Sequence, residues 1–228
     1  SGSMRLRRGR VESAALQMVK ASNKLDEVFV VNFNDDAFLD VDFTADVKKM
    51  EEGLTRIDAR GGTAMYDAIN MSIDHLLAKG KREKKVLMLI SDGADTASKT
   101  TLEKLVAQAH AAESNIVIHA IANLDEELPR EAKKARRALE TISKATGGIA
   151  FFPKTLEEVD ALALEVAKDI RNQYVIGYSP VVQELDGTFR SIRVSATGPN
   201  KPTVRTRSGY YAGPAKPQPK SSNSVLPQ

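Results

Sequence analysis

The most constraining feature of the sequence is the unbroken apolar run Val86–Ile90, with Lys84 and Lys85 before it and Ser91-Asp92-Gly93 after it. A short run that is apolar at successive positions indicates a strand covered on both faces. Such strands belong to parallel sheets with helices on each side, and these sheets bind ligands at the carboxyl ends of their strands. Asp92 therefore falls where a carboxylate can act as a helix cap, a catalytic base or a cation ligand.

Strand and helix patterns alternate along most of the chain. Apolar runs at residues 28–31, 115–123 and 149–153 predict further strands, and residues 37–43 alternate apolar and polar side chains as an edge strand does. Apolar residues at helical spacing predict helices at about 11–19, 45–57, 64–77, 102–109, 131–145 and 155–170. This order predicts an α/β fold, an open and mostly parallel sheet with right-handed crossovers.

Two local signals predict where helices end and begin. Gly147-Gly148 is a stop signal for the helix that precedes it. Thr155 followed three residues later by Glu158 predicts a capping box at the start of the last helix.

The pattern changes after Asn172. Residues 172–180, 188–196 and 203–212 are β-patterned with no helix between them, and Leu185-Asp186-Gly187 joins the first two as a hairpin turn would. We predict a small C-terminal antiparallel β extension of two or three strands. Its expected cross-strand neighbours are Tyr174, Ile176, Phe189, Ile192 and Val194.

The predicted organisation is an α/β domain over residues 1–172, a β extension over 173–212 and a tail over 213–228. The tail is rich in Pro, Ser and Lys and offers no apolar face to bury, so we expect it to be disordered. A chain of 228 residues with 42% hydrophobic content can bury one sizeable core and a small appendage.

Composition argues against several functions. Without Cys the chain has no disulfide framework, no thiolate nucleophile and no Cys-based zinc site. The net charge of +3 is small and the Arg and Lys runs lack interleaved aromatic residues, so we expect no nucleic-acid partner. No apolar run approaches the roughly 18 residues that span a bilayer. His75, His110 and His119 lack metal-ligand spacing and are expected in surface or core roles.

Three loops at the predicted carboxyl edge of the sheet carry oxygen donors. They are Ser1-Gly2-Ser3 before the first helix, Gly62-Thr63 before the third, and Asp92 after the central strand. Such oxygens suit hard cations, and the helix starts beside the first two loops would offer amide donors to an anion. Taken singly, a Ser or Thr before a helix is more often only an N-cap. Asp95 is expected to support this site or to start a helix, and Asn34-Asp35-Asp36 to form a turn.

Together, SGSM, GGT and an apolar strand ending in SDG resemble the metal-ion-dependent adhesion site of von Willebrand factor type A (VWA) domains. The family motif is DxSxS, then a Thr, then an Asp, on three separate loops. Ser1 and Ser3 match the two serines, Thr63 the threonine and Asp92 the last aspartate. The resemblance covers about residues 1–173.

This resemblance implies a three-layer Rossmann-like VWA fold with a metal site formed by Ser1, Ser3, Thr63 and Asp92. In the family such a site binds Mg²⁺, or Mn²⁺ or Ca²⁺, and through it a carboxylate on a protein partner. The C-terminal pattern is similar to that of a bacterial subgroup, which implies export to the periplasm or the cell exterior.

The chain departs from the family pattern at its start. The family's first aspartate would precede Ser1 by two positions, on a strand that this chain lacks. In the family strand order 3-2-1-4-5-6 that strand lies in mid-sheet. We therefore expect an N-terminally truncated sheet with a gap between the Val28 strand and the Val86 strand. Cation binding is expected to be weak, because only one carboxylate remains among the four residues.

Three classes of function remain open. The first, which we favour, is a metal-ion-dependent protein-binding module without enzymatic activity. The second is a Mg²⁺-dependent hydrolase using Asp92, although the sequence has no phosphate loop, no nucleophile elbow and no Ser/His/Asp set placed by motif. The third is a scaffold with a non-functional metal site, in which the β extension carries the binding.

Overall fold

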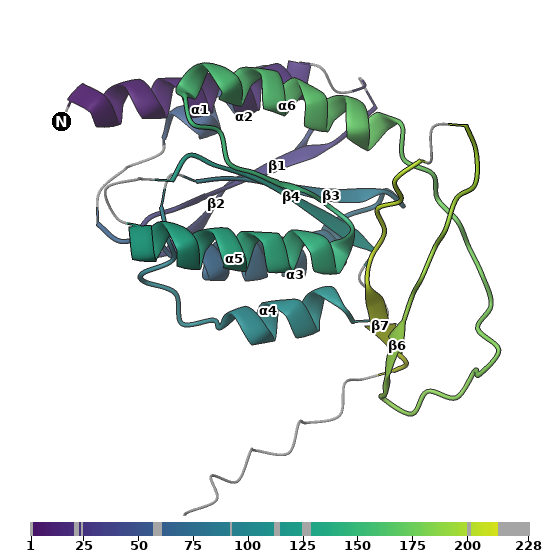
Figure 1. Cartoon of the computed structure of the whole chain (residues 1–228). Helices are drawn as coiled ribbons and strands as arrows, with labels where there is room; N and C mark the ends of the chain where they lie inside the picture. The colour runs from purple at the N-terminus through teal and green to yellow at the C-terminus, as the bar shows by residue number, and fades with distance from the viewer. Residues whose placement is uncertain are drawn as a thin grey trace, which may run out of the picture.

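The computed structural model describes residues 2–20, 23, 25–56, 61–91, 93–111, 115–124, 129–199 and 202–213, with the backbone alone for residues 2–8, 10, 11 and 156. Over these ranges a layer of strands lies between two layers of helices, and a small β extension lies at one end (Figure 1). This arrangement confirms the predicted three-layer α/β fold.

The centre of the strand layer is a parallel pair. β3 (Lys85–Ser91) and β4 (Ile116–Ala122) run side by side in unbroken register over their full length. β5 (Ala150–Phe151) adds to the other edge of β4, also in parallel. β4 is buried almost throughout because it has a strand on each edge and packs against α5 and α6.

β1 (Val28–Phe33) and β2 (Ala37–Thr44) form an antiparallel hairpin. The predicted turn closes between them, where the Asn34 N–H donates to the Asp36 carbonyl at 3.0 Å. β2 leaves Phe38 and Leu39 exposed, as expected for an edge strand.

Helices cover both faces of the strand layer (Figure 1). One face carries α1 (Gly2–Lys20), α2 (Val47–Thr55) and α6 (Leu156–Arg171). The opposite face carries α3 (Met65–Lys79), α4 (Leu102–Ala109) and α5 (Pro129–Thr146).

Apolar helix faces and strands form two cores. The larger one packs α3, α4 and α5 against the strands through Met65, Ile69, Ile73, Leu105, Ile118, Leu139 and Ile142. The smaller one packs α1 and α6 over β4 through Ala14, Ile121, Val159 and Ala163. The two cores lie on opposite faces of β4 because successive side chains of a strand point in opposite directions.

The two helix-end signals have different outcomes. α5 ends at Thr146 and is followed by Gly147, which has a left-handed φ of +83°; the Gly148 N–H donates to the Ser143 carbonyl at 2.9 Å. Thr155 is the N-cap residue of α6, as predicted. The capping box is wrong, because Thr155 makes no side-chain capping bond and Glu158 accepts from the Lys154 N–H at 3.0 Å. The carboxylate reaches one residue further back than a capping box requires.

The β extension has a different pairing from the predicted one. β6 (Phe189–Ser191) pairs antiparallel with β7 (Gly209–Tyr211), whereas the described residues 172–180 form no strand. Tyr174 and Ile176 are 93% and 73% exposed, so their expected packing on Phe189 is wrong. Phe189 instead packs against the rings of His110 and Tyr211, with centroids 5.0 and 5.3 Å away. These rings supply the apolar contacts to Phe189 that residues 172–180 were expected to supply.

β7 is anchored to the ends of α4 and α5. The Tyr211 N–H donates to the His110 carbonyl at 2.9 Å, and the Ser208 N–H donates to the Ala145 carbonyl at 3.2 Å. The Arg207 guanidinium donates to the Ala111 carbonyl at 3.4 Å. The extension therefore covers backbone carbonyls at the ends of α4 and α5.

The strand layer is interrupted in its middle. The β1–β2 hairpin and the β3–β4–β5 sheet are separate among the described residues, with β1 and β3 unpaired to each other. The sequence predicts this gap between the Val28 and Val86 strands. It leaves β3 less covered than its apolar run predicts, and only Leu89 and Ser91 of that strand are buried.

Candidate functional site

The loop that carries Thr63 is tied to the loops after β1 and β3. The Thr63 N–H donates to the Thr96 hydroxyl at 2.9 Å, and the Thr63 carbonyl accepts from the Thr96 N–H at 3.0 Å. The neighbouring Ala64 N–H donates to the Asn34 carbonyl at 2.6 Å. Thr63 is therefore held by its backbone between the carboxyl ends of two strands, where the sequence places the candidate site.

The hydroxyl of Thr63 is left available by these contacts. Among the described residues it makes no hydrogen bond, since only the backbone atoms of Thr63 are engaged. A Cβ on Gly93 would lie 3.8 Å from Thr63 Oγ1, so the hydroxyl lies beside the residue that directly follows Asp92. An oxygen donor held on a fixed backbone next to that loop is suited to a cation or to a polar ligand group.

Gly61 and Gly62 let the Asp35 carboxylate approach this loop. Asp35 Oδ1 accepts from the Gly62 N–H at 2.5 Å. Gly61 has a φ of +85°, and a Cβ at that position would overlap the Asp35 carboxylate. The turn before Thr63 thus requires glycine both for its backbone angle and for the close approach.

The start of α3 is already capped from within the chain. Asp95 Oδ1 accepts from the Tyr66 N–H at 3.0 Å, and the Ser98 hydroxyl accepts from the Asp67 N–H at 3.0 Å. The first-turn amides that the sequence offers to an incoming anion are therefore occupied at these two positions, and that expectation is wrong for them. Asp95 does not start a helix, because α4 begins at Leu102 with Thr101 as its N-cap; its carboxylate instead caps α3 from the loop after β3.

The side chain of Asp67, in the first turn of α3, also bonds to the loop after β3. Its carboxylate accepts from the Lys99 N–H at 2.9 Å and from the Thr100 N–H at 2.8 Å. Burial raises the pKa of Asp67, but the hydrogen bonds from Thr100 and Lys99 outweigh that effect and hold the pKa below its usual value. Reciprocal hydrogen bonds therefore hold the start of α3 and the loop after β3 together.

Comparison with known proteins agrees with this geometry. Residues 1–94 match the family model of the von Willebrand factor type A domain. A von Willebrand factor type A structure from Catenulispora acidiphila superposes with a TM-score of 0.62 at 17% identity, over 95% of this chain and 53% of that chain. This is a von Willebrand factor type A fold.

Two further VWA-like structures come from pilus proteins. The vWF domain of the type V pili tip protein Mfa5 from Porphyromonas gingivalis has a TM-score of 0.56 at 13% identity, over 77% of this chain and 93% of that chain. The pilus adhesin SpaC from Lactobacillus rhamnosus GG has a TM-score of 0.58 at 15% identity, over 75% of this chain and 28% of that chain. No curated protein matches the sequence. At these identities the similarity establishes the VWA fold.

The structure describes the four predicted site residues to different extents. Thr63 is described in full, whereas Ser1 and Asp92 lie outside the described residues. Ser3 is described by its backbone, in the first turn of α1. α1 begins on the side of the molecule where β3 and β4 end (Figure 1). Within the described ranges no group of three or more His, Cys, Asp or Glu side chains could hold a metal ion.

Sequence reasoning missed the residues that hold the VWA loops in place. Asp67, Thr96 and Ser98 all bond across from one loop to the other, over separations of 31 to 33 residues. The polar run that follows Asp92 signals a loop, but nothing local in it indicates which backbone groups it caps.

The three histidines lie apart, as predicted. The His75 ring stacks on Phe43 at 4.9 Å, and its Nε2 lies 2.8 Å from Asp42 Oδ1. His110 Nε2 lies 2.9 Å from the Ser208 hydroxyl, and His119 is fully buried in β4. Burial lowers the pKa of both His110 and His119, which favours their neutral form.

Proposed function

We propose that this VWA-fold chain is a protein-binding module that recognises an acidic residue on its partner through a divalent cation. The cation would be held at the carboxyl edge by the hydroxyls of Ser1, Ser3 and Thr63 and by the carboxylate of Asp92. The observation that supports this proposal is the placement of Thr63: its backbone is fixed between two loops, and its hydroxyl has no other partner among the described residues.

The four proposed ligands offer the type of donor atom, oxygen, that a hard cation prefers. Hydroxyl and carboxylate oxygens are preferred by Mg²⁺, with Mn²⁺ or Ca²⁺ as alternatives. A bound divalent cation would supply the positive charge that attracts the partner's carboxylate. Because Asp92 is the single carboxylate in the set, we expect weak binding of the cation by this chain.

The neighbouring acidic side chains of Asp35 and Asp95 already accept hydrogen bonds from within the chain. Asp35 accepts from Gly62, and Asp95 accepts from Tyr66 and from the Ser98 hydroxyl. In this proposal they hold the loops, and the partner provides the second carboxylate of the site.

The pilus proteins that share the fold make a protein partner and an exported location reasonable expectations for this chain. No helix in the described ranges has the length and apolarity needed to cross a bilayer. We propose a binding role without catalysis, and we assign no nucleic-acid partner.

The proposal is tested by titrating Mn²⁺ into the chain by calorimetry and repeating the titration with Thr63→Ala and Asp92→Ala. We expect weak binding that Asp92→Ala abolishes and Thr63→Ala weakens severalfold. Thr141→Ala is the matched control, because its exposed hydroxyl donates to the Arg137 carbonyl in the middle of α5, within the same helix. Equal Mn²⁺ affinity in all four proteins would contradict the proposal.

Partner recognition is tested with two short synthetic peptides that differ only in one Asp or Asn. The Asp peptide should bind in the presence of Mn²⁺ and be released by a chelator, while the Asn peptide should not bind. If the chelator releases neither peptide and both peptides bind equally well, the result would favour the scaffold role, with the β extension as the contact surface.

A further inference from the structure

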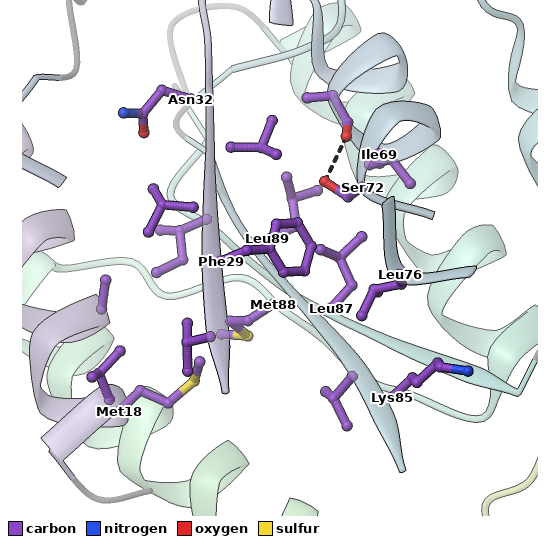
Figure 2. Close-up of a pocket in the computed structure, with 18 of the residues that line it drawn as sticks. Met18, Phe29, Asn32, Ile69, Ser72, Leu76, Lys85, Leu87, Met88 and Leu89 are labelled. Carbon is purple, nitrogen blue, oxygen red and sulfur yellow. Dashed lines mark hydrogen bonds between the residues drawn. The ribbon is translucent and has the colours of Figure 1, made fainter. Parts of the chain in front are cut away.

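Apolar side chains of the strand layer and of the C-terminal extension lie in different surroundings. Phe29, Leu87 and Leu89 line a cavity of about 600 Å³ in the gap between β1 and β3, inside the strand layer (Figure 2). The segment that leads from α6 to β6 instead leaves its large apolar side chains exposed, namely Tyr174, Val175, Ile176, Tyr178, Val181 and Val182. A contiguous exposed apolar surface of this kind is typical of an interaction site.

The backbone of this segment is extended and unpaired. Residues 173–180 run without a turn or a bend, and residues 173–183 make no backbone–backbone hydrogen bond within the described part of the chain. A Cβ on Gly177 would meet no atom within 4 Å, so the space beside it is open. In Figure 1 the segment runs along the outer side of the extension, away from the helix and strand layers. It therefore has the character of a strand that lacks a neighbour.

One side chain holds the segment against the extension. A hydrogen bond with the side chain of Tyr210, together with partial burial, raises the pKa of Tyr178. Tyr210 belongs to β7, which is bonded in turn to the end of α4 through Tyr211. The segment is thus positioned at Tyr178 while its backbone groups stay unpaired. A strand that is already positioned loses less conformational entropy when it pairs than a mobile one does.

Nothing in the sequence of the segment opposes pairing with a copy of itself. No charged residue lies between Arg171 and Glu184. Edge strands that avoid self-pairing commonly carry charged side chains or a proline within the strand. Here the proline, Pro180, comes only at the end of the straight stretch. An uncharged, apolar strand of this kind favours a second copy of the chain as its partner, because two copies bring no like charges together.

The order of side chains is close to symmetric about Ile176. Tyr174 lies two residues before it and Tyr178 two residues after it. If two copies pair antiparallel about Ile176, Tyr174 of each copy lies opposite Tyr178 of the other. The two Ile176 side chains then face each other on the same side of the ribbon as the tyrosines, since alternate residues of a strand share a face. Aromatic and β-branched side chains in such opposite positions are favourable cross-strand pairs.

Pro180 selects one hydrogen-bonding pattern for this pairing. Opposite residues of antiparallel strands alternate between pairs that exchange backbone hydrogen bonds and pairs that do not. If Ile176 is in a pair that does not, Pro180 is in such a pair too, and its missing N–H costs nothing. The backbone bonds are then exchanged by Gln173, Val175, Gly177 and Ser179.

We infer that two copies of the chain associate through residues 173–179, which pair as antiparallel strands about a twofold axis at Ile176. The contact is isologous, so each copy contributes the same residues. Two strands of this length bury less than the roughly 1,200 Å² of a stable interface, so the dimer is weak and depends on protein concentration. The inference rests on the exposed segment and is independent of the proposed cation site.

Sedimentation equilibrium tests the association. The weight-average mass should increase with protein concentration, and Ile176→Lys should weaken the association on the order of tenfold or more, because two like charges then lie opposite each other. Leu185→Lys is the matched control, since Leu185 is 79% exposed, close to the 73% of Ile176, but lies outside the paired residues. Both variants should keep the thermal midpoint of the unaltered chain, because both side chains are exposed.

Cross-linking tests where the axis lies, and the absence of Cys from the chain makes each introduced thiol unique. At the axis two Cα atoms are about 4.5 Å apart, within the range that a disulfide bridges. Ile176→Cys should therefore give a covalent dimer when diamide oxidises the two thiols. Val181→Cys is the control: its side chain is fully exposed, but the two copies of residue 181 would lie roughly 30 Å apart.

The register is tested with Gln173→Cys and Ser179→Cys. In the inferred pairing residue 173 of one copy lies opposite residue 179 of the other, whereas two copies of either residue lie about 20 Å apart. Diamide should therefore link a mixture of the two variants, and should link neither variant alone. Hydrogen exchange at Val175 and Gly177 should slow as the concentration of the unaltered chain rises.

Several results would overturn the inference. A mass that does not change with concentration is one, and equal effects of Ile176→Lys and Leu185→Lys are another. Cross-linking as efficient at residue 181 as at residue 176 would place the contact elsewhere. Slow exchange at Val175 and Gly177 in a chain that stays monomeric would show that the segment pairs within its own chain. Fast exchange in such a monomer would leave the segment for a strand of a different protein.

Discussion

The Asp95 carboxylate accepts a hydrogen bond from the Tyr66 N–H at 3.0 Å and so caps α3 from a loop 29 residues away. The helix itself supplies no cap, because its N-cap residue is Ala64. The start of α3 and the loop after β3 are consequently held together. The candidate site lies where these two segments meet.

Removing that cap should destabilise the fold. Asp95→Ala leaves the Tyr66 N–H without an acceptor, and we expect a loss of about 1–2 kcal/mol in the free energy of unfolding. Urea denaturation measures the loss. Glu51→Ala, on the exposed face of α2, is the control and should change the free energy by less than about 0.5 kcal/mol. An unchanged midpoint for Asp95→Ala would show that water replaces the cap.

Two glycine substitutions should have opposite effects. Gly61→Ala should destabilise the chain by about 1–3 kcal/mol, because a Cβ there meets the Asp35 carboxylate and φ is +85°. Gly9→Ala should stabilise it by roughly 0.5–1 kcal/mol, since a Cβ in that part of α1 meets nothing within 4 Å. Asp35→Ala combined with Gly61→Ala should recover only the part of the loss that comes from the steric contact. Similar effects of the two glycine changes on thermal midpoints would refute this account.

Stability should fall as the pH drops through the range in which histidine titrates. Burial lowers the pKa of His110 and His119 in the folded chain, so the unfolded chain binds more protons below about pH 6.5. Their contribution is complete above that pH and is lost as the pH decreases toward and below the folded pKa values. NMR titration of the ring signals should give both pKa values below 6.5, and urea midpoints should decrease from pH 7 to pH 5. A ring that titrates above 6.5 would contradict the burial argument.

Local sequence patterns predict the elements of the α/β body well. The Val86 strand, the Val28 strand and the helix stop at Gly147 all follow from short-range signals that the structure confirms. The gap beside Val28 also follows, although from the order of strands in a related family. These features depend on residues that are neighbours in the chain or on a known topology.

Long-range contacts could not be predicted in the same way. Phe189 is β-patterned, yet its partner is Tyr211 and not the equally β-patterned Tyr174. The ring of His110, at the end of α4, packs against both Phe189 and Tyr211. The same limit applies to the candidate site. The motif predicts Thr63 as a site residue, whereas the hydrogen bonds that Thr63 and Tyr66 donate to Thr96 and Asp95 follow only from the fold.

The contact between His110 and Ser208 joins residues 98 positions apart. Closing a loop of that length costs chain entropy before any contact forms, so we expect β7 to dock late in folding and to open early in unfolding. A chain cut at residue 172, where the α/β pattern ends, would leave the carbonyls of His110, Ala111 and Ala145 uncovered. We therefore expect a chain that ends at residue 172 to unfold at a lower temperature than one that extends to Tyr211.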